Sequence, residues 1–333
     1  MARLRPFRFG VFAEGVRSRE ALLDTARRAE DGGFATFLIR DHFIAEPFGH
    51  QLAPLTALAT VAAVTRTLRI GSLVFANDYR HPVVLAKEVA TLDVLSEGRF
   101  ELGLGAGFSR AEYEQAGIAF DPPQVRAERL EEALHIVKGL FSDAPFTFAG
   151  HHYSVSSLNT FPKPLQRPHP PILVGAASSR MLSIAARHAD IIGLQTVSTT
   201  RGVLAQDPKV RSASIVGEKI EQVRHAAGER FEEIELSMVA SVIITDHRQE
   251  AAEQFARHRG WRDTAHGLGK GQRVLRDTAA DEVLTMPSVF IGTVDHIVDE
   301  MRGRRERYGI SYYVLFDQLM ESVAPLVTRL AGE

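Results

Sequence analysis

The sequence contains no cysteine, which excludes disulfide bonds, thiolate metal sites and cysteine nucleophiles. It has no uninterrupted apolar run of about 18 residues, the length that a membrane-spanning helix needs. Residues 1–9 are basic but lack the apolar stretch of a signal peptide. The hydrolase motif Gly-x-Ser-x-Gly and the zinc motif His-Glu-x-x-His are also missing. We therefore expect a cytoplasmic protein that binds no membrane and no metal.

The chain is also not strongly basic. The 333 residues carry 39 Lys and Arg against 41 Asp and Glu, a formal net charge of −2. This balance gives no electrostatic footprint for nucleic acid. Since 45% of the residues are hydrophobic and no break in composition divides the chain, we expect a single domain over residues 1–333 with a large core.

Strand-like and helix-like segments alternate along the chain at a spacing of about 30 residues, as in proteins with parallel sheets. Eight segments have strand character: Phe7–Phe12, Phe34–Arg40, Leu68–Phe75, Arg99–Leu104, Pro171–Val174, Asp190–Leu194, Ile234–Thr245 and Tyr312–Phe316. Helix-like segments lie between them, several opened by proline or serine. Eight such units predict a (β/α)8 TIM barrel with insertions. A doubly wound open sheet is the alternative.

Two segments do not fit the repeat, and we expect them to be insertions. Residues 146–170 begin with the alternating pattern of a small hairpin and end in a proline-rich run. Residues 260–290 contain several glycines and suggest a mobile lid near the barrel mouth.

An acid and an imidazole, Asp41 and His42, follow the second strand-like segment. Functional side chains concentrate where the strands of a βα protein end, because the sheet holds them in place. Histidine is the usual acid or base of enzyme sites, and His42 would serve in that role beside a ligand. The alternative is that the pair only caps a turn. In a barrel, Glu14 and Thr196 would face the same mouth from the ends of strands one and six.

A run of three glycines follows the fourth strand-like segment. The stretch Gly103–Gly107 lacks the last glycine of a dinucleotide fingerprint, because Phe108 stands there. The missing side chains would instead let a flat ligand lie close to the backbone. We predict that Gly105, Ala106 and Gly107 contact such a ligand.

A second stretch of small residues, Gly175, Ala176, Ala177 and Ser178, joins a strand to a helix. The free amides and the dipole at that helix start suit a phosphate group. The equally weighted alternative is that Ser178 merely caps the helix.

Six motifs form a pattern that extends over nearly the whole chain: Ala29–Phe34, Asp41–Phe43, Leu68–Val74, Arg80–Pro82, Leu92–Gly107 and Ile291–Thr293. In these motifs the chain resembles the bacterial luciferase-like monooxygenase superfamily, and most of all its branch that uses the deazaflavin coenzyme F420. The resemblance implies a (β/α)8 barrel, a homodimer, and a deazaflavin or flavin at the C-terminal mouth.

The resemblance also implies where the cofactor lies. Relatives carry a bulge with a non-proline cis peptide on strand three, which bears on the central ring of the cofactor. The matching positions here are Ser72, Leu73 and Val74, with Leu73–Val74 as the expected cis bond. The cofactor phosphate is expected at residues 175–178, which favours the phosphate reading of that stretch.

Catalytic and substrate residues follow from the same resemblance. In deazaflavin-dependent relatives the histidine matching His42 acts as base or orienting donor beside the reactive carbon, and Asp41 would buttress it. Sugar-phosphate dehydrogenases of this branch have a glutamate where Phe108 stands, so we expect a more apolar substrate pocket. Its candidate aromatic walls are Phe43, Phe75, Phe108 and Phe316.

Our first hypothesis is therefore an F420-dependent oxidoreductase that transfers a hydride between the coenzyme and a small organic molecule. An FMN-dependent monooxygenase that consumes O2 is the alternative on the same fold. A non-catalytic flavin-binding protein is the second alternative.

Overall fold

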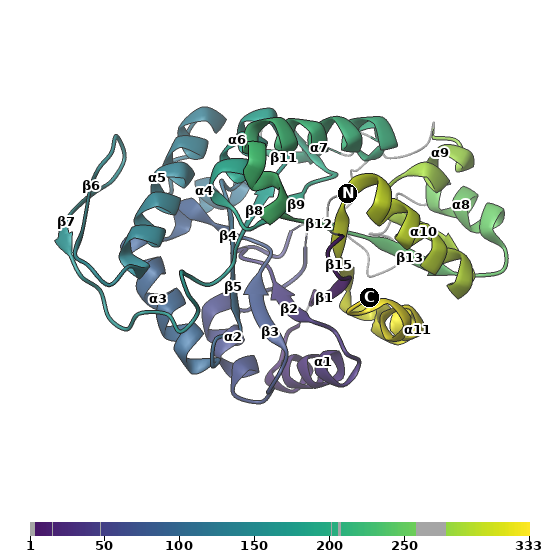
Figure 1. The fold of residues 1–333 in the computed structure, drawn as a ribbon, viewed down its shortest axis with the longest axis horizontal. Coiled ribbons are helices and arrows are strands. Elements are labelled where there is room, and N and C mark those ends of the chain that lie inside the picture. The colour runs from purple at the N-terminus through teal and green to yellow at the C-terminus, as the bar shows by residue number, and fades with distance from the viewer. Residues whose placement is uncertain (1–3, 15, 47, 201, 206–207, 258–277) are drawn as a thin grey trace.

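Over residues 4–14, 16–46, 48–200, 202–205, 208–257 and 278–333, the computed structural model describes a closed barrel of eight parallel strands (Figure 1). The strands run around it in the order β3-β2-β1-β15-β12-β9-β8-β5, and β5 pairs with β3 to close it. They are β1 (Arg8–Phe12), β2 (Thr36–Ile39), β3 (Arg69–Ser72), β5 (Phe100–Gly105), β8 (Ile172–Ala176), β9 (Ile191–Leu194), β12 (Glu235–Val239) and β15 (Ile310–Phe316). Each overlaps a predicted strand, so the (β/α)8 barrel is confirmed and the open sheet is excluded.

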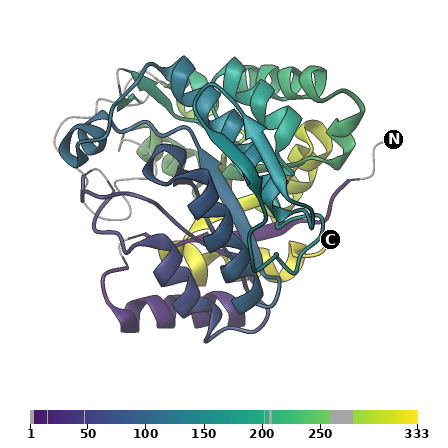
Figure 2. The same cartoon turned by 90° about the vertical axis from the view of Figure 1, so that its left-hand side faces the viewer.

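Helices surround the barrel on its outside (Figures 1 and 2). Those predicted from the sequence are α1 (Arg19–Asp31), α2 (Pro54–Ala62), α3 (Pro82–Leu95), α5 (Pro123–Phe141), α6 (Ser179–His188), α7 (Ala213–Ala227), α10 (Val294–Tyr308) and α11 (Met320–Leu330). Proline opens α2, α3 and α5, where its missing N–H breaks no helical hydrogen bond. Among the described residues, no helix combines the length and hydropathy needed to cross a lipid bilayer.

The single strand predicted over residues 234–245 is wrong, because the chain changes partners after β12. The amide of Ala240 still bonds to β15, whereas the next amide, of Ser241, bonds to the segment before β14. From there β13 (Ser241–Ile244) pairs in parallel with β14 (Val289–Gly292), apart from the barrel. Sequence analysis also missed the helices α4 (Arg110–Ala116), α8 (Arg248–Arg257) and α9 (Ala280–Thr285).

The first expected insertion contains the predicted hairpin. Its strands, β6 (Phe146–Ala149) and β7 (Ser154–Leu158), pair antiparallel at the periphery of the molecule (Figure 1). Of the second expected insertion, the part up to residue 277 lies outside the described residues, so the lid stays a prediction. In the loop after β9, β10 (Ser198–Thr200) and β11 (Val203–Ala205) form a further small antiparallel pair.

Apolar side chains fill two regions. A large core lies between the strands and the surrounding helices, and a smaller cluster fills the inside of the barrel. The inner cluster consists of Phe12, Leu38, Leu73, Leu173, Ile191, Tyr312, Val314 and Phe316. The inside of the barrel is therefore a packed core rather than a pore. A ligand can bind only at the mouth of the barrel.

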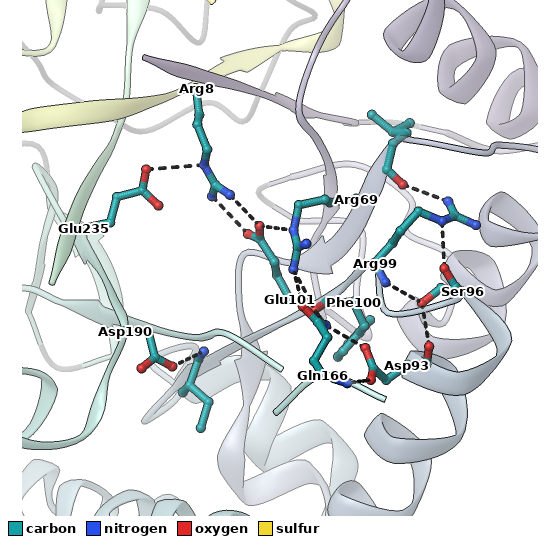
Figure 3. Close-up of polar contacts among 12 residues, drawn as sticks. Arg8, Arg69, Asp93, Ser96, Arg99, Phe100, Glu101, Gln166, Asp190 and Glu235 are labelled. Carbon is teal, nitrogen blue, oxygen red and sulfur yellow. Dashed lines mark hydrogen bonds and ion pairs between the residues drawn. The ribbon is translucent and has the colours of Figure 1, made fainter. Parts of the chain in front are cut away.

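Charged side chains close the opposite, amino-terminal end of the barrel (Figure 3). Glu101, buried at the start of β5, accepts hydrogen bonds from Nη1 of Arg8 (2.9 Å) and Nε of Arg69 (2.6 Å). Arg8 also lies 3.3 Å from Glu235, and Arg69 donates to Gln166 at 3.0 Å. Burial alone would raise the pKa of Glu101, but the two guanidinium groups hold it below its usual value. Two arginines therefore share one ionised carboxylate.

Candidate active site

The barrel mouth contains Asp41 and His42 directly after β2, as predicted. The His42 ring stacks on Phe48, with 4.5 Å between centroids, and meets Phe108 edge-on at 5.8 Å. Its Nδ1 lies 2.8 Å from Oε2 of Glu112, and only 12% of the side chain is exposed. The imidazole is thus held by two rings and one carboxylate.

Glu112 is the acid of this site that sequence analysis missed. It comes from α4 and is buried. Its Oε1 accepts from the amides of Phe43 (2.6 Å) and Ile44 (3.3 Å), and its Oε2 from the hydroxyl of Tyr79 (3.3 Å). Burial acts to raise the pKa of Glu112, but the hydrogen bonds from His42 and from the amides of Phe43 and Ile44 lower it. The side chain is therefore a carboxylate.

Asp41 has different partners from those expected. Its two oxygens bind Nη1 and Nη2 of Arg80 at 2.6 and 3.1 Å, and one also accepts from the amide of Ala76 at 3.1 Å. The expectation that Asp41 buttresses His42 is wrong, because Glu112 occupies that place. Asp41 instead fixes the loop after β4 (Phe75–Ala76), and a direct catalytic role for it stays a prediction.

The third barrel strand breaks between β3 and β4, where the Leu73–Val74 peptide bond is cis, as predicted. The hydroxyl of Ser72 donates to the carbonyl of Gly103 at 2.9 Å, and Leu73 enters the inner cluster. Val74 packs against that cluster and stays partly exposed. The geometry of the bulge is confirmed, while contact of Ser72, Leu73 and Val74 with a cofactor stays a prediction.

The bulge explains why β5 has glycine at positions 103 and 105, since a larger residue there would collide with it. A Cβ on Gly103 would overlap the carbonyl of Ser72, and one on Gly105 would lie 2.7 Å from Cγ2 of Val74. The expected reason for these glycines, space for a flat ligand, is therefore wrong: the space is filled by strand three. Cofactor contact at residues 105–107 stays a prediction.

The stretch after β8 starts a helix as predicted. Ser178 caps α6, with its Oγ accepting from the amide of Met181 at 3.4 Å. A Cβ on Gly175 would lie 3.6 Å from Cγ2 of Val74, so the end of β8 borders the same bulge. The capping reading is confirmed, and phosphate binding by the remaining amides of residues 175–178 stays a prediction.

Two predicted substrate residues, Glu14 and Phe316, are joined to the imidazole through aromatic rings. Phe316 stacks on Phe12, with 5.8 Å between centroids. Arg40, which bonds to Glu14 through Nε at 2.6 Å, lies 4.2 Å over Phe12 and 4.0 Å over Phe48. Since Phe48 stacks on the imidazole, these side chains form one continuous wall at the mouth.

The other predicted wall residues differ in placement. Phe43 is 55% exposed at the rim, where its ring packs on Tyr79 at 4.3 Å. Thr196, beyond the end of β9, is partly exposed. The prediction for Phe75 is wrong, because its ring is buried in the outer core beneath Arg80. Substrate contact of the remaining residues, including Phe108, stays a prediction.

Asp317, directly after β15, is a further acid of the mouth that sequence analysis missed. Burial and the charge of Glu14 raise the pKa of Asp317 to about 7, against the effect of backbone hydrogen bonds. The two acids meet because β1 and β15 are neighbours in the barrel. Asp317 can therefore exchange a proton near neutral pH at the same mouth as His42.

Known proteins are similar to this chain in sequence and in fold. The sequence model of the luciferase-like monooxygenases matches residues 7–311. An F420-dependent glucose-6-phosphate dehydrogenase of Nakamurella multipartita is 30% identical over 254 residues, which cover 74% of this chain and 71% of that protein. An F420-dependent hydroxymycolic acid dehydrogenase of Mycobacterium tuberculosis is 28% identical over 296 residues, 84% and 76% of the two chains.

Solved structures agree on the fold. An F420-dependent secondary alcohol dehydrogenase, in complex with an F420-acetone adduct, has a TM-score of 0.71 at 18% identity and covers 98% of both chains. A coenzyme F420 dependent tetrahydromethanopterin reductase from Methanopyrus kandleri has a TM-score of 0.73 at 20% identity with the same coverage. The match of the family's sequence model over nearly the whole chain identifies the family, as the resemblance predicted. This chain belongs to the luciferase-like monooxygenase family.

Proposed function

We propose that this chain is a coenzyme F420-dependent oxidoreductase that transfers a hydride between the deazaflavin and a small, rather apolar organic substrate. The observation that carries the proposal is the imidazole of His42, held at the mouth by Glu112 between the rings of Phe48 and Phe108. The relatives named as F420-dependent dehydrogenases support the choice of cofactor.

The residues around the cis bond fit a flat ring system. Val74, at the cis bond, is partly exposed, packs on the apolar inner cluster and borders Gly175, where a Cβ would lie 3.6 Å from its Cγ2. Apolar surface of this kind suits an aromatic ring. In this proposal the bulge of residues 72–74 and residues 105–107 hold the ring, and residues 175–178 hold the phosphate. When bound, the deazaflavin supplies the carbon that takes up or returns the hydride.

His42 handles the proton that accompanies the hydride. Oxidation of an alcohol, for example, removes a hydride from carbon and a proton from oxygen, and the reverse reaction returns both. A positioned imidazole can take up that proton or return it. The rings of Phe48 and Phe108 keep one side of this imidazole free of water.

Phe108 supports an apolar substrate. Its ring lies against the imidazole, where the sugar-phosphate dehydrogenases of this branch carry a glutamate. Arg40 and Glu14 neutralise each other, so they add no net charge to the mouth. We therefore expect a sugar phosphate to be a poor substrate, although one relative is named as a glucose-6-phosphate dehydrogenase.

Cofactor titration tests the function. We expect the apoprotein to bind F420 at least about 10-fold more tightly than FMN, a difference of about 1.4 kcal/mol. A Gly175→Leu variant should lose most of this binding, because its side chain would enter the space beside Val74. Gly217→Leu on α7 is the matched control, since a Cβ there meets no atom within 4 Å. Tight FMN binding without F420 binding would favour the FMN-dependent monooxygenase instead.

We also infer a homodimer, which the family resemblance implies. Helices α2 and α3 border an apolar groove of about 420 Å³. Val84 and Leu95, which line it, are 51% and 63% exposed. A second copy would remove this apolar surface from water. Light scattering should give twice the mass of one chain, and a monomer at micromolar concentration would contradict the inference. The cytoplasmic location stays a prediction.

A further inference from the structure

A carboxylate can only accept hydrogen bonds, and this property fixes the proton of His42. Both oxygens of Glu112 already accept from N–H or O–H donors, so the ring nitrogen 2.8 Å from its Oε2 must be a donor as well. A neutral imidazole has a single N–H, and with that proton on Nδ1 the lone pair stays on Nε2. Among the described residues, no group bonds to Nε2 of His42.

We propose that Glu112 is a positioning residue that holds His42 as the Nδ1–H tautomer and leaves Nε2 as the proton acceptor toward the substrate. This inference rests on the proposed function in one respect, the reaction in which Nε2 takes up a proton. The tautomer itself depends only on the contacts of Glu112.

The other contacts of Glu112 keep it a hydrogen-bond acceptor. The amides of Phe43 and Ile44 can only donate, so Oε1 has to stay an acceptor. Burial and the negative charges of Glu112 and Asp41 raise the pKa of Tyr79, so its hydroxyl keeps its proton and donates to Oε2. Four donors thus fix the orientation of one buried carboxylate.

Glu112 also differs from the acids around it in its ion-pair partner. Asp41 is paired with Arg80, Glu14 with Arg40, and Asp78 with Arg129 through Nη2 at 3.1 Å. Among the described residues, Glu112 has no such guanidinium partner and its only cationic partner is the imidazole. When Nε2 takes up a proton, the positive charge forms directly beside an uncompensated carboxylate. Glu112 therefore orients the imidazole and stabilises its protonated form.

A Glu112→Gln variant separates these effects from packing. Glutamine has nearly the same shape, but its amide oxygen must serve the amides of Phe43 and Ile44. Its NH2 group then faces Nδ1 as a donor and forces the proton of the neutral ring onto Nε2. We expect kcat for alcohol oxidation to fall about 100-fold, while KM and F420 affinity change by less than about threefold.

Nitrogen-15 NMR of the His42 ring in the apoprotein reads the tautomer directly. The proton should be on Nδ1 in the unchanged protein and on Nε2 in Glu112→Gln. Glu114→Gln is the matched control on the same helix, because Glu114 is 59% exposed and pairs with Arg110. It should alter neither the tautomer nor kcat.

Two results would overturn the inference: a proton on Nε2 in the unchanged protein, or an unaltered kcat in a variant whose tautomer has changed. The spectrum of the unchanged protein decides the first point even when Glu112→Gln does not fold. Because the spectrum needs no cofactor, a wrong cofactor assignment would abolish activity with F420 and leave the tautomer result intact.

Discussion

Replacing His42 with alanine is expected to lower kcat by about 1,000-fold, within the range of about 10²–10⁴ that a positioned acid or base contributes. The variant loses the nitrogen that exchanges the substrate proton but keeps the bulge at Leu73–Val74 and the glycines beside it. F420 affinity should therefore change little. Steady-state rates with small alcohols and ketones, measured beside an F420 titration, separate the two effects.

Two further variants make this result specific. His50→Ala removes an exposed imidazole eight residues away and should leave kcat unchanged. Asp317→Asn tests the acid beside Glu14 at the mouth. We expect the smaller loss there, because among the described residues no contact joins Asp317 to His42 or to Phe108. If Asp317→Asn abolished turnover while His42→Ala kept it, the proton route would run through Asp317.

Replacing Glu101 with alanine is expected to lower the free energy of unfolding by about 3–5 kcal/mol, the usual cost of removing one partner from a buried ion pair. Arg8 and Arg69 would lose the carboxylate that they share, and Glu235 alone would remain near Arg8. Urea unfolding monitored by circular dichroism measures the change. F420 affinity should be unaltered, because the cluster lies at the end of the barrel opposite the mouth.

We expect the difference in unfolding free energy between the unchanged protein and Glu101→Ala to disappear at low pH. The pKa of Glu101 is lowered in the folded protein, so its contribution to stability is fully present above the unfolded pKa, near 4.5. That contribution is lost as the pH falls through the lower folded pKa. The unfolding free energies of the unchanged protein and Glu101→Ala should therefore converge in acid.

The control for this prediction is Glu321→Ala, which breaks the exposed pair with Arg28 at 2.9 Å. Glu321 is 86% exposed, so this change should cost at most about 1 kcal/mol. Equal effects of the two variants at neutral pH would mean that the cluster of Glu101 does not stabilise the barrel.

The barrel could be predicted because its evidence is repetitive. Each strand-like segment is short, apolar and followed by a helix with its own start signal, so errors in single boundaries do not alter the count. A parallel barrel brings all its strand ends to one mouth, which is why Glu14, His42 and Thr196 could be placed there without knowing any contact. The strand prediction failed after Ala240, where the backbone changes its hydrogen-bond partner. Such a change does not alter the pattern of hydrophobic residues in the sequence.

The partner of His42 could not be predicted for a related reason. Asp41 and His42 are adjacent in sequence, but neighbouring side chains beyond a strand point in different directions. Asp41 accordingly faces Arg80, and the imidazole faces an acid 70 positions further along. That acid, Glu112, lies on a helix of only seven residues, too short for a periodic pattern. Its only mark in the sequence is one of two acids that flank Tyr113.

The four hydrogen bonds of Glu112 have a consequence for how this protein can acquire new substrates. Barrel enzymes commonly diverge by exchanging the loops at the mouth, one loop at a time. Here the loop after β2, the loop after β4 and the helix after β5 share one buried charge. Replacing the helix alone leaves these donors without a carboxylate, and replacing either loop alone leaves the carboxylate with fewer donors. These three segments therefore form a single exchangeable module, whereas rim side chains such as Phe43 can vary independently.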